Sequence, residues 1–530
     1  MSYYRSRSKR SKRTKEKSHP SIEQTTKVEK VSMALDKNLS AIKTNLGDSN
    51  DVVVRRFNIN KDTKAALVYI DGLADRISLQ DFILKVSMSN SNRTDQDIEN
   101  NSVSKKSINY LKEQATSIGE VKDVTNFKDT LGAILSGDTA VLIESYDSAI
   151  IASTRGWEKR DVSEPTTQNV IRGPKEAFTE NLRTNTSLIR RKIKDPDIRI
   201  ESKTIGKHTN TDIAIVYIDS ISNKKVLDEV RKRIDQIDID GILESAYIEE
   251  MIEDSNSSPF PTIINSERPD VVSAALLEGR VAIIIDGTPF VLIVPALFIH
   301  FFQSPEDYYE RSFYGIIRVL RYLAFFSALL VPSLYIAVTT FHQEMIPTTL
   351  LIDLAAQREG IPFPAYVEAL IMEVTFEILR EAGIRMPRAI GQAVSIVGAL
   401  VLGQAAVEAG LVSPTMVIVV SITAISSFVF PAYDMAISVR ILRFGFMTLA
   451  ATFGLFGISI GLFLMLLHLC SLRSFGIPYM SPFGPVNFTD QKDAVFRFPR
   501  KLLSTRPRLI NQTNTKRQNN YRKKYGRENS

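Results

Sequence analysis

The sequence predicts an α/β soluble region of two similar duplicated subdomains, followed by an all-α membrane bundle of about four helices plus an amphipathic interfacial helix. Its 530 residues exceed one ordinary domain, and the apolar residues gather after about residue 280. The polar half contains an internal repeat, and the apolar half contains segments long enough to cross a bilayer. We divide the chain into a disordered basic tail (1–50), a first subdomain (51–170), a connecting helical segment (171–211), a second subdomain with a Pro-Phe-Pro connector (212–305), a membrane domain (306–472) and a second basic tail (473–530).

Both ends of the chain are strongly basic. RSRSKRSKRTKEK covers residues 5–17, KRQNNYRKKYGR covers 516–527, and the whole chain has a net charge of +7. Such tails can bind nucleic acid, but beside membrane helices they mark the cytoplasmic side. We therefore expect both termini on the cytoplasmic side, an even number of crossings and no nucleic-acid partner. The first residues are charged rather than apolar, so insertion should rely on internal helices.

The polar half contains the repeat. AALVYIDGLADRISLQDFI (65–83) matches IAIVYIDSISNKKVLDEVR (213–231), and ILSGDTAVLIESYDSAIIAS (134–153) matches LLEGRVAIIIDGTPFVLIVP (276–295). In each copy an apolar strand runs into a helix, and a later Leu-x-Gly turn feeds two more apolar strands. This pattern predicts two α/β subdomains of the same design.

Two segments beside the second copy are candidates for a contact between chains or for a connector. RGPKEAFTENLRTNTSLIRRKIK (172–194) has the charge order of a stable helix, with acidic residues first and basic residues last. Its Phe178, Arg190 and Arg191 could pack on a subdomain or on a neighbouring chain. Pro259, Phe260 and Pro261 form a rigid extended connector, because proline restrains both itself and the preceding residue.

An amphipathic helix is expected at 364–382. Val367, Ile371, Val374 and Ile378 form one row, and Glu373, Glu377 and Glu381 form a neighbouring row. The helix cannot cross lipid alone, because a central charge costs about 3 kcal/mol. The glutamates could be a solvated face paired with Arg380, Arg385 and Arg388, or an acidic vestibule that concentrates cations.

Four membrane helices are expected near 319–341, 389–411, 415–432 and 445–469. FVLIVPALFIHFF (290–302) is short for a crossing and contains Pro295, so we expect a strand end that leads into an interfacial or re-entrant piece. If this segment crosses after all, the count is five rather than four. Asp434 lies just before the last helix, near Arg440 and Arg443, and an interfacial ion pair is the simplest expectation there.

The helix 389–411 is the best pore candidate. A row of small residues, Gly391, Ser395, Ala399 and Gly403, is explained by close helix packing alone. A second row puts two valines beside an amide and a carboxylate, which suggests a dewetting gate with a charged mouth. This row consists of Val397, Val401, Gln404 and Glu408.

Enzyme chemistry is the weakest interpretation. The chain has one cysteine, Cys470, and five scattered histidines, without a phosphate-binding glycine loop or a spaced metal-ligand motif. We expect no catalytic residue, metal or cofactor.

Four long motifs in order resemble the A subunit of the GerA-type spore germinant receptors. They are the segment 172–194, SSPFPTIINSERPD (257–270), IPFPAYVEALIMEVTFEILREAGIRMP (361–387) and GQAVSIVGALVLGQAAVEAGLVSP (391–414). The resemblance runs from about residue 50 to 505.

The resemblance implies a multipass protein of the inner membrane of the bacterial spore, with its soluble region facing the core. It implies self-association into a ring with a pore that releases monovalent cations, and partners in a transporter-like B subunit and a lipoprotein C subunit. An accessory-channel branch of the family is equally compatible. A secondary transporter using Glu408, or a non-conducting scaffold subunit, remains as an alternative.

Overall fold

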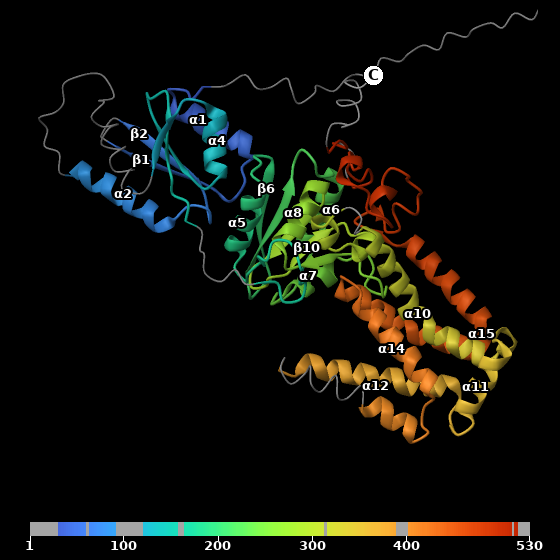
Figure 1. The fold of residues 1–530 in the computed structure, drawn as a ribbon. Coiled ribbons are helices and arrows are strands. Elements are labelled where there is room, and N and C mark those ends of the chain that lie inside the picture. Colours follow the sequence, from blue (N-terminus) through green and yellow to red (C-terminus); the bar gives the residue numbers. More distant parts are fainter. Residues whose placement is uncertain are drawn as a thin grey trace, which may run out of the picture. The chain divides into compact units, whose positions relative to one another are not determined.

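The computed structural model describes residues 30–59, 63–91, 120–156, 164–311, 315–387, 401–510 and 514–517. The chain divides into two compact units, Met1–Thr44 with Val52–Gly156, and Asn45–Asp51 with Trp157–Ser530. Each unit contains one five-stranded sheet, and the second unit also contains the long apolar helices (Figure 1).

The sheet of the first unit has the strand order β1-β2-β4-β5-β3, and all neighbours are antiparallel. Its inner strand β2, between β1 and β4, is buried over Ala65–Ile70, which is why the run AALVYI is almost entirely apolar. The elements of this unit are α1 (Leu35–Leu46), β1 (Val52–Asn58), β2 (Lys64–Ile70), α2 (Arg76–Ser91), β3 (Val121–Val124), α4 (Phe127–Leu135), β4 (Thr139–Ile143) and β5 (Ala149–Ala152).

The sheet of the second unit has the corresponding order β6-β7-β9-β10-β8, again antiparallel. The matched sequence stretches supply β2 and β7, and β4-β5 and β9-β10, at equivalent places; their origin by duplication stays a prediction. The elements are α5 (Leu182–Lys192), β6 (Ile198–Ile205), β7 (Thr211–Ile218), α6 (Lys224–Asp235), α7 (Ser245–Ile252), β8 (Ile264–Ser266), α8 (Pro269–Glu278), β9 (Val281–Ile285) and β10 (Val291–Val294).

Alternation along the strands builds two cores on the second sheet. Ile213, Ile215 and Tyr217 of β7 pack with α6 and α7, whereas Ala214 and Val216 pack with α5 and α8 on the other face. The sheet begins at β6, inside the segment 171–211 that we expected to be a helical connector. The reason is that IRIESKTI alternates in burial and pairs with β7 along its whole length.

The helical part of the second unit begins after β10. Residues expected to be an interfacial or re-entrant piece instead form the buried 3₁₀ helix η3, which packs beneath α10. The elements are η3 (Phe298–Phe302), α9 (Glu306–Tyr309), α10 (Ile317–Thr340), η5 (Gln343–Met345), α11 (Thr348–Arg358), α12 (Ala365–Arg385), α14 (Pro414–Phe428), α15 (Tyr433–Ser471), β11 (Arg473–Ser474), β12 (Ile477–Pro478), η6 (Gln491–Asp493) and η7 (Arg500–Leu502).

Two helices of the described chain, α10 and α15, are long and apolar enough to cross a membrane. The helix α14 is apolar but has only 15 residues, fewer than the expected 415–432. It ends at Phe428 because Pro431 cannot continue a helix and restrains the residue before it. The segment 388–400, and with it most of the expected pore helix, lies outside the described residues.

The helix α15 folds back on itself at Gly454, so the single helix expected at 445–469 is split. Gly454 has φ 62° and ψ −140°, a conformation open almost only to glycine. Ser438 contacts Pro259 while His468 contacts Ser258, although a straight helix would separate them by about 45 Å. Residues 433–453 form the first arm of a hairpin and residues 455–471 form the second arm.

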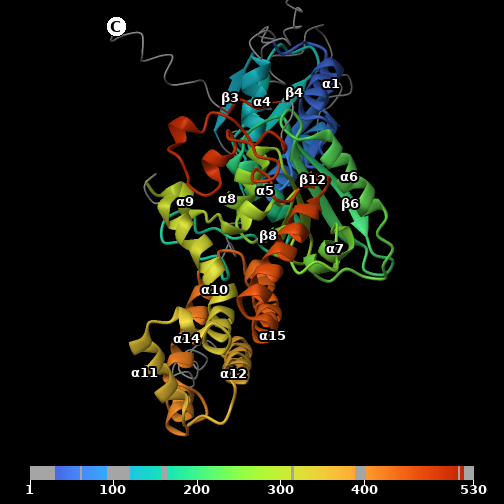
Figure 2. The ribbon, with the colours of Figure 1, turned by 90° about the vertical axis from the view of Figure 1, so that its right-hand side faces the viewer.

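The chain after α15 returns to the second sheet. Phe475, Ile477, Ala494 and Ile510 are buried in the core that α6 and α7 form with this sheet. We call residues 472–510 the C-terminal strap. Figure 2 shows it beside the second sheet, above the helices.

Candidate functional site

The Pro-Phe-Pro connector lies between the second sheet and both arms of α15. Ser258 Oγ is 2.9 Å from His468 Nε2 on the second arm, and Ser438 on the first arm donates a hydrogen bond to the carbonyl of Pro259. Phe260 is 1% exposed and belongs to the core that also contains η3, α10 and α15. The connector therefore holds both ends of the hairpin against the sheet.

A second contact joins β8 to the start of α15. Asn265 Nδ2 donates to Asp434 Oδ2 over 2.9 Å, so Asp434 is held by an amide. The expected pair with Arg440 and Arg443 is absent among the described contacts, because both arginines turn toward α12. Burial, together with the charges of Asp434 and Glu253, raises the pKa of the nearby Glu249 to about 8.

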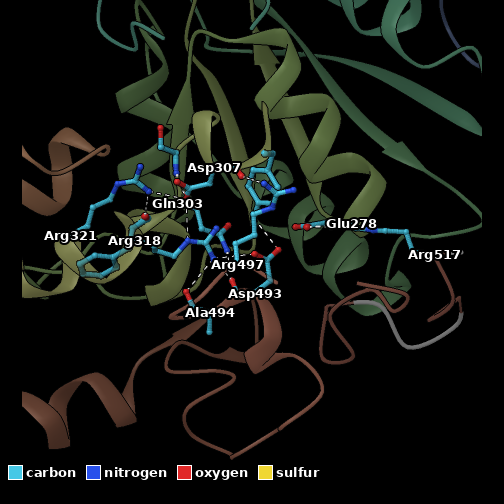
Figure 3. A network of polar contacts seen from close by, with 12 residues as sticks. Glu278, Gln303, Asp307, Arg318, Arg321, Asp493, Ala494, Arg497 and Arg517 are labelled. Atoms are coloured by element: carbon cyan, nitrogen blue, oxygen red, sulfur yellow. Dashed lines mark hydrogen bonds and ion pairs between the residues drawn. The ribbon is translucent and has the colours of Figure 1, made fainter. Parts of the chain in front are cut away.

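A buried polar network joins α10 to the C-terminal strap (Figure 3). Arg318 on the first turn of α10 donates to Asp307 over 3.0 Å and to the carboxylate of Asp493 over 3.0 Å. Arg321 reaches Asp307 over 2.8 Å, and Arg497 of the strap donates to the Asp307 carbonyl. Burial raises the pKa of Asp493, and Arg318 opposes that rise. The network fixes the base of α10 to two other segments.

A cavity of about 40 Å³ lies beside this network, between η3 and the strap. His300, Gln303, Asp490 and Asp493 are among the residues that line it. Its volume is sufficient for a few water molecules. Within the described ranges, no group of three or more potential metal-ligating side chains is arranged around an ion.

The acidic row of α12 faces the chain itself. Glu373 is buried and paired with Arg443, and Glu377 Oε2 is 3.0 Å from Arg440 Nη1, both arginines lying on the first arm of α15. Glu381 is exposed and pairs with Arg385 over 2.6 Å. Arg380, a partner expected for the row, instead donates to Ser427 over 2.6 Å.

The apolar row of the same helix points away from the chain. Ile371, Val374 and Ile378 are 39%, 43% and 63% exposed. The helix is amphipathic as expected, but its charged side is the one that packs against the chain.

Residues 401–408 form the described part of the pore candidate. Val401 is 52% exposed, and Gln404 and Glu408 are also exposed, with Gln404 donating to Glu408 over 3.2 Å. Val397 lies outside the described residues, so only three of the four members of this row are placed.

The candidates of the segment 172–194 lie mostly inside their own unit. Phe178 is 2% exposed in the core under α5 and α8. Arg190 is fully buried and donates to both carboxylate oxygens of Asp51, over 2.8 and 3.0 Å. Arg191 is partly exposed and reaches Glu176 over 3.2 Å. The helix begins at Leu182 because Asn181 caps it, so the preceding RGPKEAFTE is not helical.

Sequence reasoning missed the network of Arg318, Asp307 and Asp493. One signal was present, since Arg318 and Arg321 lie three residues apart at the start of an apolar helix, where a charge needs a partner. Nothing local indicates Asp493, which follows Arg318 by 175 residues.

Comparison with known proteins identifies relatives along most of the chain. The family described as "Bacillus/Clostridium GerA spore germination protein" matches residues 40–509. "Spore germination protein KA" of Bacillus subtilis (strain 168) is 49% identical over 92% of this chain and 89% of its own length. "Spore germination protein GerLA" of Bacillus cereus is 40% identical over 89% of this chain and 94% of its own length.

Another relative is named only for its membrane character, and one solved structure is similar. "Uncharacterized membrane protein YfkQ" of Bacillus subtilis (strain 168) is 44% identical over 90% of this chain and 91% of its own length. The N-terminal domain of the A subunit of the Bacillus megaterium spore germinant receptor GerK3 is 40% identical and covers 51% of this chain and 98% of that chain, with a TM-score of 0.41. The extent of the family match and the identity to these relatives show that the chain belongs to the GerA spore germination protein family.

Proposed function

We propose that this chain is the A subunit of a nutrient-responsive spore germination receptor, and that copies of it form a membrane channel that releases monovalent cations during germination. The observation that carries the receptor assignment is the family match over residues 40–509. The relatives named as spore germination proteins support it.

The assembly that we propose is a ring of copies of this chain, working with a transporter-like B subunit and a lipoprotein C subunit. It lies among the lipids of the inner spore membrane, with the soluble region and both basic termini on the core side. The two apolar helices support membrane insertion, and the basic tails support this orientation.

The channel proposal is supported by the side chains of residues 401–408. Val401 and Glu408 are exposed on the isolated chain, and the described partner of Glu408 is the neutral amide of Gln404. Glu373, by contrast, is neutralised by Arg443. A carboxylate without a cationic partner in a membrane domain is a candidate for ion binding. We place the gate at Val401, with Val397, and the charged mouth at Glu408.

In this proposal only one member of the acidic row of α12 contributes to a cation-attracting vestibule. Glu373 and Glu377 hold α12 against the first arm of α15, and Glu381 remains at the exposed end of the row. Since its pair with Arg385 is solvent-exposed and worth only about 0.5 kcal/mol, Glu381 is the member best suited to attract cations at a vestibule.

Potassium release from spores tests the channel. The spores carry Val401→Ala as their only copy of the chain, and Leu402→Ala is the matched control because it is an equally exposed neighbour off the Val401 row. We expect release without nutrient from Val401→Ala alone, at unchanged protein level and spore integrity, because a smaller side chain weakens a dewetting gate.

The variant Glu408→Gln then distinguishes a channel from a scaffold role in the receptor. A channel mouth predicts slower nutrient-triggered release with normal assembly, because the charge that concentrates cations is gone. If both Val401→Ala and Glu408→Gln release potassium like wild type, the channel proposal is wrong, and a scaffold role in the receptor replaces it.

A further inference from the structure

Apolar side chains at and just before helix α7 face away from the second sheet. Tyr247 and Met251 of the helix are 42% and 46% exposed, and their spacing of four residues places them on one side of it. Leu243, which precedes the N-cap residue Glu244, is 71% exposed. The opposite side of the helix buries Ile248 and Ile252 in the core of the sheet. The α7 region of this subdomain thus presents three exposed apolar side chains.

This helix lies at the end of the subdomain from which the apolar helices extend. In both ribbon views α7 lies on the side of the second sheet that faces α12 and α14, and α6 lies farther from those helices (Figures 1 and 2). Glu249 of α7 lies close to Asn265 and Asp434, the second residue of α15. The three apolar side chains are therefore at the level where the first arm of α15 begins.

Of the four glutamates in and beside α7, Glu250 is exposed, and the other three are partly buried and interact within the protein. Glu244 accepts a hydrogen bond from the Ala246 amide over 2.6 Å and caps the helix, and Glu253 accepts from the Thr262 amide over 3.0 Å. Glu249 lies among the acidic side chains of Asp434, Glu253 and Glu244, and its pKa is raised to about 8, so it is mostly uncharged at neutral pH. These arrangements lower the repulsion between α7 and an anionic membrane surface.

We propose that Leu243, Tyr247 and Met251 insert into the headgroup and upper acyl region of the membrane, so that α7 anchors the soluble subdomain on the lipid surface. Aliphatic side chains beside a tyrosine are the composition of an interfacial anchor, because the ring sits among the headgroups while its hydroxyl stays wet. The proposal rests on the membrane placement of the helices proposed above. We assign lipid rather than another protein as the contact of these side chains, because they lie at the height where, in the proposed membrane placement, the hairpin of α15 enters the bilayer.

Quenching by brominated lipid tests this in the full chain. The sole tryptophan, Trp157, is replaced by phenylalanine, and the protein is reconstituted in phosphatidylcholine nanodiscs with bromine near the headgroup end of the acyl chains. Tyr247→Trp and Met251→Trp are two probes of the exposed apolar side chains. Lys225→Trp, exposed on α6, is the control distant from lipid, and Phe456→Trp, 67% exposed on α15, is the control within lipid.

The expected result is a large loss of emission for Tyr247→Trp, Met251→Trp and Phe456→Trp, with little loss for Lys225→Trp. If Phe456→Trp is quenched while both α7 probes are not, the anchor is disproved and the membrane placement stands. Blue-shifted but unquenched emission from both α7 probes also overturns the proposal, because it means that protein covers these side chains. If Phe456→Trp is unquenched as well, the membrane placement fails together with the anchor.

Discussion

Glu373 of α12 and Arg443 of α15 form an ion pair in which the two side chains are 0% and 1% exposed. They are 70 residues apart in the sequence, and their pairing joins α12 to the first arm of α15. In the described part of the chain, Arg443 Nε and Nη2 have no hydrogen-bond partner, so the carboxylate is the main compensation for a buried charge.

Replacing Glu373 should therefore destabilise the chain strongly. We expect Glu373→Gln to lower the free energy of unfolding by about 3–5 kcal/mol, because it leaves Arg443 buried without a counter-charge. Chemical unfolding of the full chain in detergent micelles measures this. Glu381→Gln, whose pair is exposed, should change stability by only about 0.5 kcal/mol. Equal stabilities for the two variants would contradict the buried pair.

Gly454 should tolerate no side chain. A Cβ there would lie 2.8 Å from His342 Cε1, and the backbone has a positive φ, so Gly454→Ala should cost about 2 kcal/mol or more. Gly445→Ala is the control, because no atom lies within 4 Å of its added Cβ and alanine favours a helix. Thermal unfolding in micelles compares them, and similar melting temperatures would show that the turn at Gly454 is not required.

Two adjacent arginines of α5 should behave differently. Arg190→Ala leaves Asp51 buried and unpaired and should cost about 3–5 kcal/mol. Arg191→Ala removes a partly exposed pair with Glu176 and should cost about 1 kcal/mol or less. Denaturant titration of both variants measures the difference. A larger loss for Arg191→Ala would instead favour a contact of that residue with another chain.

Glu249 should make stability fall as the pH rises. Its pKa in the folded chain is about 8 and exceeds the ordinary glutamate value of about 4.3, so the folded state binds the proton more tightly. The resulting stabilisation is fully present below pH 4.3 and is lost as the pH rises through 8. Glu249→Gln should remove this slope, so unfolding free energies of wild type and variant, measured from pH 5 to 9, should diverge at the alkaline end. Parallel curves would show that Glu249 titrates normally.

Local pattern was sufficient for some elements and insufficient for others. Val216 and its neighbours in β7 form an unbroken apolar run that needs burial on both faces, so the strand is readable from sequence alone. The strand β6 was also predictable, since IRIESKTI alternates in burial, although we expected a helical connector over 171–211. The second sheet therefore begins before the predicted boundary at residue 212.

The local sequence could not show which side of α12 packs against the chain. Its apolar and acidic rows are clear, but the same spacing of acidic residues fits a row that faces water, a pore or arginines on another helix. Only tertiary structure brings Arg440 and Arg443 to it. Gly454 is similar, because a glycine in an apolar helix usually indicates close packing, and its proximity to His342 exists only in the tertiary structure.

The burial of Ile510 and Ala494 beneath the second sheet has a consequence for biosynthesis. These residues are translated after both long apolar helices, α10 and α15, yet they complete a hydrophobic core whose first strands are made some three hundred residues earlier. The ribosome must therefore synthesise nearly the whole polypeptide before this core can close. A premature stop codon after α15 would then leave the core of the second sheet incomplete, although that sheet lies far upstream in the sequence. The truncated chain would misfold, and this misfolding would be detectable before any defect in germination.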